Sequence, residues 1–304
     1  MTTLKKKTMI ALMLLMASVS LQAQLLYKIS GKGLTQPSYI VGTYHLAPAS
    51  FVDSIPGIRQ AMDSCQQVYG ELPMDKMANP DSLAMMQRAM MLPDGMTLDK
   101  LLTADEMARL NVYMKSVMGM DMTNPLVAQQ MNSMTPMALS TTLTMMSFAK
   151  KSKSLDMMNL LDSYFQKEAL AKGKSVGGLE TMSHQIKVLY EGKSLDRQKE
   201  ILMCQVDNAD FMEKMEDGIF NAYFAQDLEA ISKAMDMKLN SHCDATPEEE
   251  AAILSNRNAN WLTKMPDIMA QKPTLFAVGA GHLPGDKGVL NLLRQAGYKV
   301  EPVK

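Results

Sequence analysis

Apolar residues fall into short runs near both ends of the chain, whereas through the middle they recur every three or four positions. Short β-rich runs bounded by Gly or Pro predict strands, and the longer period predicts amphipathic helices. The predicted strands are Leu25–Ile29, Pro37–Gly42, Gln67–Glu71, Ser175–Glu180, Thr274–Gly279 and Tyr298–Val303. The pattern therefore predicts an α+β fold. Two α/β ends, residues 24–74 and 268–304, flank a mostly helical insertion over residues 75–267, whose one strand, near 175–180, we expect to be buried.

Two helix starts in the insertion carry capping signals. Thr103 and Glu106 have the spacing of a capping box, and Thr246 is followed by Pro247 and by Glu249, which can reach back to the cap. We expect the helix from Thr246 to run through Arg257 and Trp261. Helices are also predicted over residues 54–65, 96–119, 155–173, 207–237 and 287–296.

One pattern occurs at both ends of the chain. QPSYIVGTYHL is followed by a helix and by VYGE, and KPTLFAVGAGHL is followed by a helix and by YKVE. Each unit reads strand, Gly-x-x-His, helix, strand. We therefore predict a mixed sheet in which these two pseudo-repeated units pair, with the helical insertion between them as a lid or wall.

The two motifs predict a site at the end of the sheet. In open α/β sheets ligands bind beyond the carboxyl ends of the strands, where Gly42 and Gly279 would allow sharp turns. His45 and His282 would then reach the same edge, beside Glu71 at the end of the next strand. Two imidazoles and one carboxylate form a minimal divalent-metal site with open positions.

Further residues complete the predicted chemistry. Water on such a metal becomes acidic enough to act as hydroxide near neutral pH. Glu71 would be a ligand or general base, and Glu180 a second carboxylate that moves protons. Arg257 would bind a substrate carboxylate or an oxyanion. The alternative for each is structural: hydrogen-bonded histidines, capping carboxylates and an ion-paired arginine. His184 and His242 lie in no motif, and we expect them to be structural.

The first residues predict export. Lys5, Lys6 and Lys7 precede an apolar run at residues 9–19 and a small Ala23, so residues 1–23 have the pattern of a cleaved signal peptide, with an uncleaved anchor as the alternative. The rest of the chain holds 28 basic and 32 acidic residues, a net charge of −4. That charge argues against a nucleic-acid partner. We expect a periplasmic or extracellular protein without a stable membrane anchor.

Sulfur-containing residues leave alternatives open. The three cysteines allow one disulfide, for which we favour Cys204 with Cys243 since both lie in the C-terminal half; otherwise all three, Cys65 included, are small buried residues. Their spacing resembles no zinc motif. The 32 methionines spread over the predicted helices. They favour adaptable core packing over a Cu(I) carrier, which thioethers would also suit.

Several of these segments resemble the TraB/GumN family, bacterial relatives of Tiki-type metalloproteases. The resembling pieces are IVGTYHL, YGEL, GKSVGGLET with Gln185, SNRNANW and FAVGAGHLPGDKGVLNLLRQAGYKVEPV. The family commonly has an aliphatic residue where this chain has Tyr44. The resemblance implies a superfamily shared with erythromycin-esterase-like and haem-binding ChaN-like proteins. It also implies a metal-dependent hydrolase with His45, Glu71 and His282 in the site, supported by Glu180 and Arg257.

The residues and the resemblance lead to one functional hypothesis and one rival. The hypothesis is a peptidase-like hydrolase that uses Mn, Co or Zn and acts on a peptide or other small-molecule amide or ester. The rival is a non-catalytic protein that binds haem or another apolar ligand, with a histidine as axial ligand.

Overall fold

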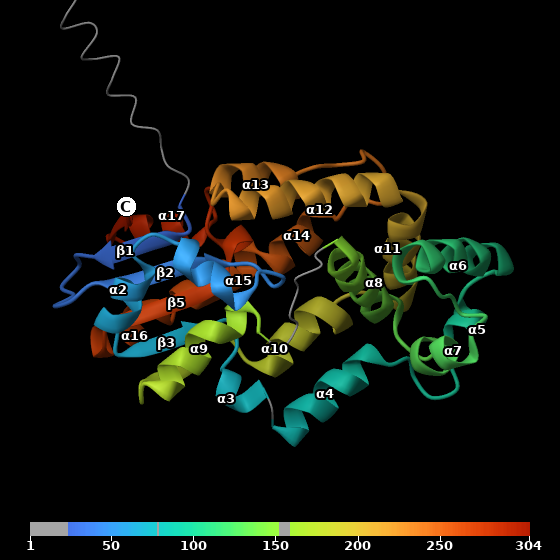
Figure 1. Ribbon diagram of the computed structural model, residues 1–304, viewed down its shortest axis with the longest axis horizontal. Coiled ribbons are helices and arrows are strands. Elements are labelled where there is room, and N and C mark those ends of the chain that lie inside the picture. Colours follow the sequence, from blue (N-terminus) through green and yellow to red (C-terminus); the bar gives the residue numbers. More distant parts are fainter. Residues whose placement is uncertain (1–23, 78, 152–158) are drawn as a thin grey trace, which may run out of the picture.

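A six-stranded mixed sheet forms one end of the molecule (Figure 1). The computed structural model describes residues 24–77, 79–151 and 159–304, so the predicted signal peptide lies outside the described residues. The strands are β1 Leu26–Ser30, β2 Ser38–Thr43, β3 Gln67–Gly70, β4 Ser175–Gly178, β5 Thr274–Gly279 and β6 Lys299–Pro302, in the order β4-β3-β5-β2-β1-β6. All six predicted strands are present, which confirms the mixed α/β character of the chain.

Helices make up most of the remaining described chain. They are η1 Ala49–Ser54, α2 Ile58–Ser64, α3 Met74–Met77, α4 Pro80–Met90, α5 Leu98–Leu101, α6 Ala104–Met118, α7 Pro125–Met131, α8 Pro136–Lys151, α9 Leu161–Ala171, α10 Met182–Ile186, the π-helix η2 Lys187–Glu191, α11 Leu195–Asp207, α12 Ala209–Phe224, α13 Leu228–Met235, α14 Pro247–Ile253, α15 Ser255–Leu262, α16 Met265–Gln271, η3 Ala280–His282 and α17 Val289–Gln295. Part of the helix predicted over residues 155–173 falls on 152–158, outside the described residues.

Both predicted capping boxes are present, at Thr103 before α6 and at Thr246 before α14. The helix from Thr246 does not run on unbroken, however. At Leu254 the backbone has φ −119° and ψ −74°, which separates α14 from α15. Arg257 and Trp261 both lie on α15, in its buried face.

The strand β4 is not buried, contrary to the prediction. It lies at the edge of the sheet, and Ser175 is exposed. Gly177 and Gly178 of this strand allow neighbouring residues to pack closely against its backbone. A Cβ on Gly177 would come 2.5 Å from the Tyr69 ring, and one on Gly178 would come 2.3 Å from Pro73.

Four neighbouring strands run parallel, and this aligns the two Gly-x-x-His motifs. β2 pairs with β5, β5 with β3 and β3 with β4, all in parallel, so their carboxyl ends share one edge. Gly42 is opposite Val278 and Thr43 is opposite Gly279. The antiparallel strands β1 and β6 complete the other side of the sheet. The strands that follow the two motifs separate, since β3 lies beside β5 and β6 beside β1.

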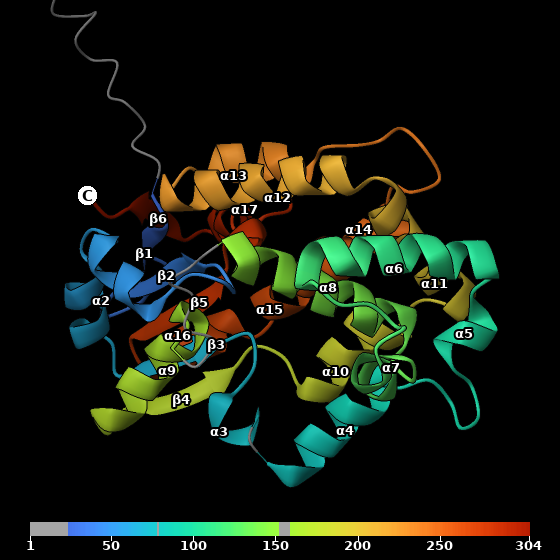
Figure 2. The ribbon, with the colours of Figure 1, turned by 45° about the vertical axis from the view of Figure 1, so that its right-hand side comes forward.

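Buried apolar side chains form two clusters. One surrounds the sheet, where α9 packs along β3, β4 and β5. The other lies among helices α5 to α8 and α11, at the far end of the molecule from the sheet (Figures 1 and 2). Within the described residues, no helix combines the length and the hydropathy needed to cross a bilayer.

Candidate active site

The predicted site residues follow the carboxyl ends of the four parallel strands. Glu71 comes directly after β3, and Glu180 lies two residues after β4. The strand ladder continues between them, because the Glu180 N–H donates to the Glu71 carbonyl at 2.9 Å. His282 ends η3, which follows β5, and His45 lies two residues after β2. Parallel pairing therefore orders these side chains along one edge.

Arg257 lies at the centre of this group. Its Nη2 donates to Glu71 Oε2 at 2.5 Å and to Glu180 Oε1, and its Nε donates to Glu180 Oε2 at 3.2 Å. Its Nη1 donates to His282 Nε2 at 3.0 Å and to the Ile253 carbonyl at 3.2 Å. A guanidinium has five N–H donors. All five have acceptors inside the protein, so none is directed at a substrate in this arrangement.

The two carboxylates share this one guanidinium. The Glu180 side chain has no exposed surface, and that of Glu71 is 13% exposed. Gln185 Nε2 donates to both, at 3.1 Å to Glu180 and 3.3 Å to Glu71, and the Gly279 N–H donates to Glu71 Oε1 at 2.8 Å. Two carboxylates against one arginine leave a surplus negative charge, which a cation would compensate.

The protonation of Glu71 follows from its neighbours. Burial would raise the pKa of its carboxyl. Attraction to the protonated form of His282, the charges of Arg257 and His45 and the Gly279 N–H outweigh burial, so the pKa of Glu71 lies below its usual value. Glu71 is therefore ionised at neutral pH, as a metal ligand or a general base must be.

His282 presents its Nε2 lone pair to this charged group. Asn258 Nδ2 donates to the Lys287 carbonyl at 2.9 Å, which orients the amide so that its Oδ1 faces His282 Nδ1 at 2.7 Å. An amide oxygen only accepts, so Nδ1 carries the proton and Nε2 is unprotonated. Burial lowers the pKa of His282 to about 4, with Glu71 opposing and Arg257 adding to the shift. The Trp261 ring packs against the imidazole, with centroids 4.4 Å apart.

His45 is held in a similar way by a different partner. Its Nδ1 lies 2.6 Å from Oδ2 of Asp162 on α9, and its side chain is 77% exposed. Asp162 raises the pKa of His45 to about 9. The Asp162 contact leaves Nε2 of His45 without a hydrogen-bond partner among the described residues. The positive charge of His45 lowers the pKa values of both Glu71 and His282, so the two imidazoles interact electrostatically across the site.

The motif glycines permit close approach and do not form the sharp turns that we expected. Neither Gly42 nor Gly279 has a positive φ. A Cβ on Gly42 would lie 3.0 Å from Ala280 Cβ and from Leu283 Cδ1, in the second motif. A Cβ on Gly279 would lie 3.1 Å from Glu71 Oε1. The glycines thus let the two motifs, and the carboxylate between them, come together.

Aromatic side chains form a wall next to His45. Tyr44 packs against Phe148 of α8 and Tyr223 of α12, with ring centroids 6.0 and 5.3 Å apart. The Tyr223 hydroxyl donates to the Gly42 carbonyl at 3.2 Å. Phe51 packs against Tyr223 at 5.5 Å. The helical insertion therefore contributes directly to the surroundings of the first motif.

The predicted metal ligands are only partly assembled. Glu71 Oε1 and His282 Nε2 are 3.9 Å apart. Among the described residues, the one group of three potential ligand atoms within 4.8 Å of one another is Cys204, His242 and Cys243. His45 therefore does not lie within that distance of both Glu71 and His282. The donor set nevertheless fits a divalent cation, because Asp162 and Asn258 anchor Nδ1 of the two imidazoles. Since the pKa of His45 is about 9, its Nε2 would release a proton when the cation binds. A cation on His282 would replace its hydrogen bond from Arg257.

Three residues of this site were not singled out from the sequence. Asp162 belongs to no motif, and only its position beside His45 in the fold reveals it. Asn258 directly follows Arg257 in SNRNANW, so the segment was recognised but not the role of this residue. His184 was expected to be purely structural, yet its Nε2 lies 3.9 Å from Glu180 Oε2, at the border of the site.

Comparison with known proteins finds a matching family and several distant relatives. The model of the TraB/PrgY/gumN family matches residues 25–302. Similar curated proteins include a "Metalloprotease TIKI homolog" from Nematostella vectensis, 21% identical over 89% of this chain and 65% of the relative. "Metalloprotease TIKI2" from Danio rerio is 24% identical over 87% of this chain and 58% of the relative. The chain thus spans about three fifths of these relatives. No solved structure matches significantly.

Proposed function

Because the chain belongs to the TraB/PrgY/gumN family, we propose that it is a divalent-metal-dependent hydrolase with peptidase-like activity. The metal would be held by His45, Glu71 and His282. Relatives named as metalloproteases support a metal-dependent protease as the class of activity. The substrate class, a peptide or another amide or ester, and the metal itself, Mn, Co or Zn, are part of this proposal.

The observation that carries the proposal is the pair of oriented imidazoles beside an ionised carboxylate. Asp162 and Asn258 each occupy the Nδ1 side of a histidine, as acceptors do behind metal-ligating histidines. Nε2 of each histidine would be the ligand atom, and Nε2 of His45 would lose its proton when the cation binds. The surplus negative charge of Glu71 and Glu180 over Arg257 adds electrostatic attraction for a cation.

Each residue has a defined task in the proposed reaction. When bound, a divalent ion polarises the scissile carbonyl and makes water acidic enough to deliver hydroxide. Glu71 serves as ligand or general base, with Oε1 oriented by the Gly279 N–H. Glu180, predicted to move protons, is buried against Arg257, so we assign it first to holding that guanidinium. Arg257 positions the carboxylates and His282, in place of the substrate-binding role that we expected.

We further propose that the substrate approaches beside Tyr44, the partly exposed member of the aromatic wall, behind which Phe148 and Tyr223 are buried; this suits an apolar side chain of a peptide. We also propose that the protein works outside the cytoplasm. The Cys204–Cys243 disulfide, which confirms the favoured pairing, supports an oxidising compartment and agrees with the predicted signal peptide. Cys65 is free and buried.

Metal content and peptide cleavage test the proposal together. The wild type, His45→Ala, Glu71→Gln and His282→Ala would be stripped with a chelator, reloaded with Mn²⁺, Co²⁺ or Zn²⁺ and assayed on a peptide library by mass spectrometry. Glu229→Gln is the matched control, because Glu229 is 80% exposed and pairs only with Lys233 of its own helix among the contacts described. We expect the three site variants to lose metal affinity at least tenfold and to lose cleavage. Retention of both would contradict the proposal, and a Soret band in purified protein would favour the haem-binding rival.

A further inference from the structure

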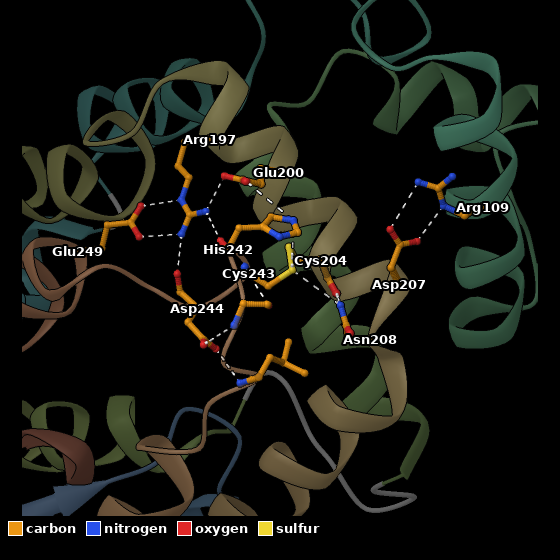
Figure 3. Close-up of a disulfide and its surroundings, with 12 residues drawn as sticks. Arg109, Arg197, Glu200, Cys204, Asp207, Asn208, His242, Cys243, Asp244 and Glu249 are labelled. Atoms are coloured by element: carbon orange, nitrogen blue, oxygen red, sulfur yellow. Dashed lines mark hydrogen bonds and ion pairs between the residues drawn. A yellow bond between two sulfur atoms is a disulfide. The ribbon is translucent and has the colours of Figure 1, made fainter.

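A second group of potential metal ligands lies on elements that do not build the candidate active site. Cys204 is near the end of α11, and His242 and Cys243 lie on the segment between α13 and α14 (Figure 3). One ligand atom from each lies within 4.8 Å of the other two. In this structure the two sulfurs are joined as a disulfide.

The spacing of this group matches a tetrahedral thiolate–imidazole site. Zinc lies about 2.3 Å from sulfur and about 2.1 Å from nitrogen, so a tetrahedral site separates an S and an N ligand by about 3.6 Å. The distance from Cys243 Sγ to His242 Nε2 is 3.7 Å. The sulfur–sulfur distance would increase to about 3.8 Å once the bond between the sulfurs is broken. Cys204 Sγ already lies within 4.8 Å of the histidine ligand atom.

The segment that carries His242 and Cys243 is held in place independently of the disulfide. Arg197 on α11 donates to the His242 and Asp244 carbonyls, both at 2.9 Å, and also to Glu249. The Asp244 carboxylate accepts the Leu239 N–H at 2.8 Å and the Ser241 N–H at 3.1 Å. These bonds would survive reduction, so the ligands would remain near their present positions, as an effective metal site requires.

Neighbouring side chains supply a fourth donor and support for a thiolate. Glu200 Oε1 lies 4.0 Å from His242 Nε2, and Asn208 Nδ2 donates to Cys243 Sγ at 3.8 Å (Figure 3). Glu200, His242 and both cysteines line one side of a cleft of about 620 Å³. The His242 side chain is 71% exposed. A metal ion can therefore reach the group from solvent.

We propose that Cys204, Cys243 and His242 form a redox-gated site for Zn²⁺. A dithiol reductant delivers two electrons and two protons to the disulfide, which becomes two thiols while the reductant becomes a disulfide. Zn²⁺ then binds both sulfurs and His242 Nε2, and two protons leave to solvent. In the return step a disulfide oxidant takes up the two electrons, and two protons from solvent, and becomes a dithiol, while the Cys204–Cys243 disulfide re-forms and the ion is released. Thiolate and imidazole ligands suit zinc better than the oxygen-preferring Mg²⁺ or Ca²⁺.

The site connects two parts of the chain. Cys204 lies on α11, whose Leu202 and Met203 belong to the helical cluster. The His242–Cys243 segment leads through α14 into α15, which carries Arg257. The disulfide and the zinc-bound form would both tie α11 to this segment, so the connection is kept in oxidising and in zinc-replete reducing conditions. The reduced, metal-free form alone would lose this link through sulfur and would keep only the hydrogen bonds of Arg197 between α11 and the segment.

Metal binding to oxidised and reduced protein tests this inference separately from the proposed function. The measurements would use the His45→Ala/His282→Ala double variant, so that the candidate active site contributes no histidine ligand. Zinc uptake would be measured against a chromogenic chelator, and Co²⁺ would report thiolate ligation through its charge-transfer absorption. Cys243→Ser and His242→Ala would be added one at a time in the same background.

We expect the reduced protein to bind one more equivalent of zinc than the oxidised protein. Cys243→Ser should abolish that increment and the cobalt–thiolate band, and His242→Ala should weaken zinc binding about tenfold or more. Equal zinc uptake by oxidised and reduced protein would overturn the inference. So would a reduced Cys243→Ser variant that binds zinc as well as its parent, or a His242→Ala variant of unchanged affinity.

Discussion

The buried arginine of the candidate site provides a measurable stability prediction. Arg257→Met keeps most of the side-chain volume and removes all five donors. It leaves Glu180, whose side chain has no exposed surface, without its cation. Breaking a buried ion pair by removing one partner costs about 3–5 kcal/mol, because the remaining charge is desolvated and uncompensated. We expect a loss of this size in the free energy of unfolding at neutral pH.

A matched arginine separates the effect of burial from the number of hydrogen bonds. Arg197 also makes five, to Glu249, Glu200 and two carbonyls. Its side chain is 18% exposed and those of Glu249 and Glu200 are 16% and 38% exposed, against 5% for Arg257 and none for Glu180. Arg197→Met should cost about 1–2 kcal/mol, since water can replace part of its contacts. Both variants would be unfolded in urea with a chelator present, so that no divalent ion stabilises the native state.

A double-mutant cycle identifies the source of the loss. Glu180→Gln in the Arg257→Met background removes the uncompensated charge, so the double variant should be more stable than Arg257→Met alone. We expect a coupling energy of about 1–3 kcal/mol between the two positions. The reasoning is refuted if Arg257→Met costs no more than Arg197→Met, or if the coupling energy falls below about 0.5 kcal/mol.

Three further predictions concern the two motifs. Asp162→Asn should weaken metal binding about 10–100-fold, as measured by calorimetry. The control is Asp63→Asn, which removes an exposed ion pair with Lys172, the residue after α9, and should leave metal binding unchanged. Gly42→Ala should lower the free energy of unfolding by about 1–3 kcal/mol, because the methyl group would meet Ala280 and Leu283 at 3.0 Å; unchanged stability would contradict that close contact. Asp162 raises the pKa of His45 to about 9, so the ion pair between them stabilises the folded, metal-free protein while His45 is protonated. This stabilisation should be complete below about pH 6.5 and be lost as the pH rises through about 9. Urea unfolding should show no such loss in Asp162→Asn.

Local sequence patterns predicted the secondary structure well because the relevant forces are local. Alternation, turn residues and capping side chains act within a few positions, so all six strands and the caps at Thr103 and Thr246 are where they were expected. The prediction was wrong where a neighbour decides the outcome. Gly177 and Gly178 marked a strand correctly, but only the packing of Tyr69 and Pro73 explains why they are glycines in an edge strand.

The sequence by itself determined which chemical groups stand at the ends of the strands, and the repeated Gly-x-x-His motif was sufficient to pair His45 with His282 in one hypothesis. Which partners those groups have was decided only by tertiary structure. The contacts of Asp162 and Asn258, and those of Arg257 with Glu71, Glu180 and His282, depend on chain segments that are distant in sequence. Hydrogen-bond geometry and desolvation act between such segments, and no local pattern of residues encodes them.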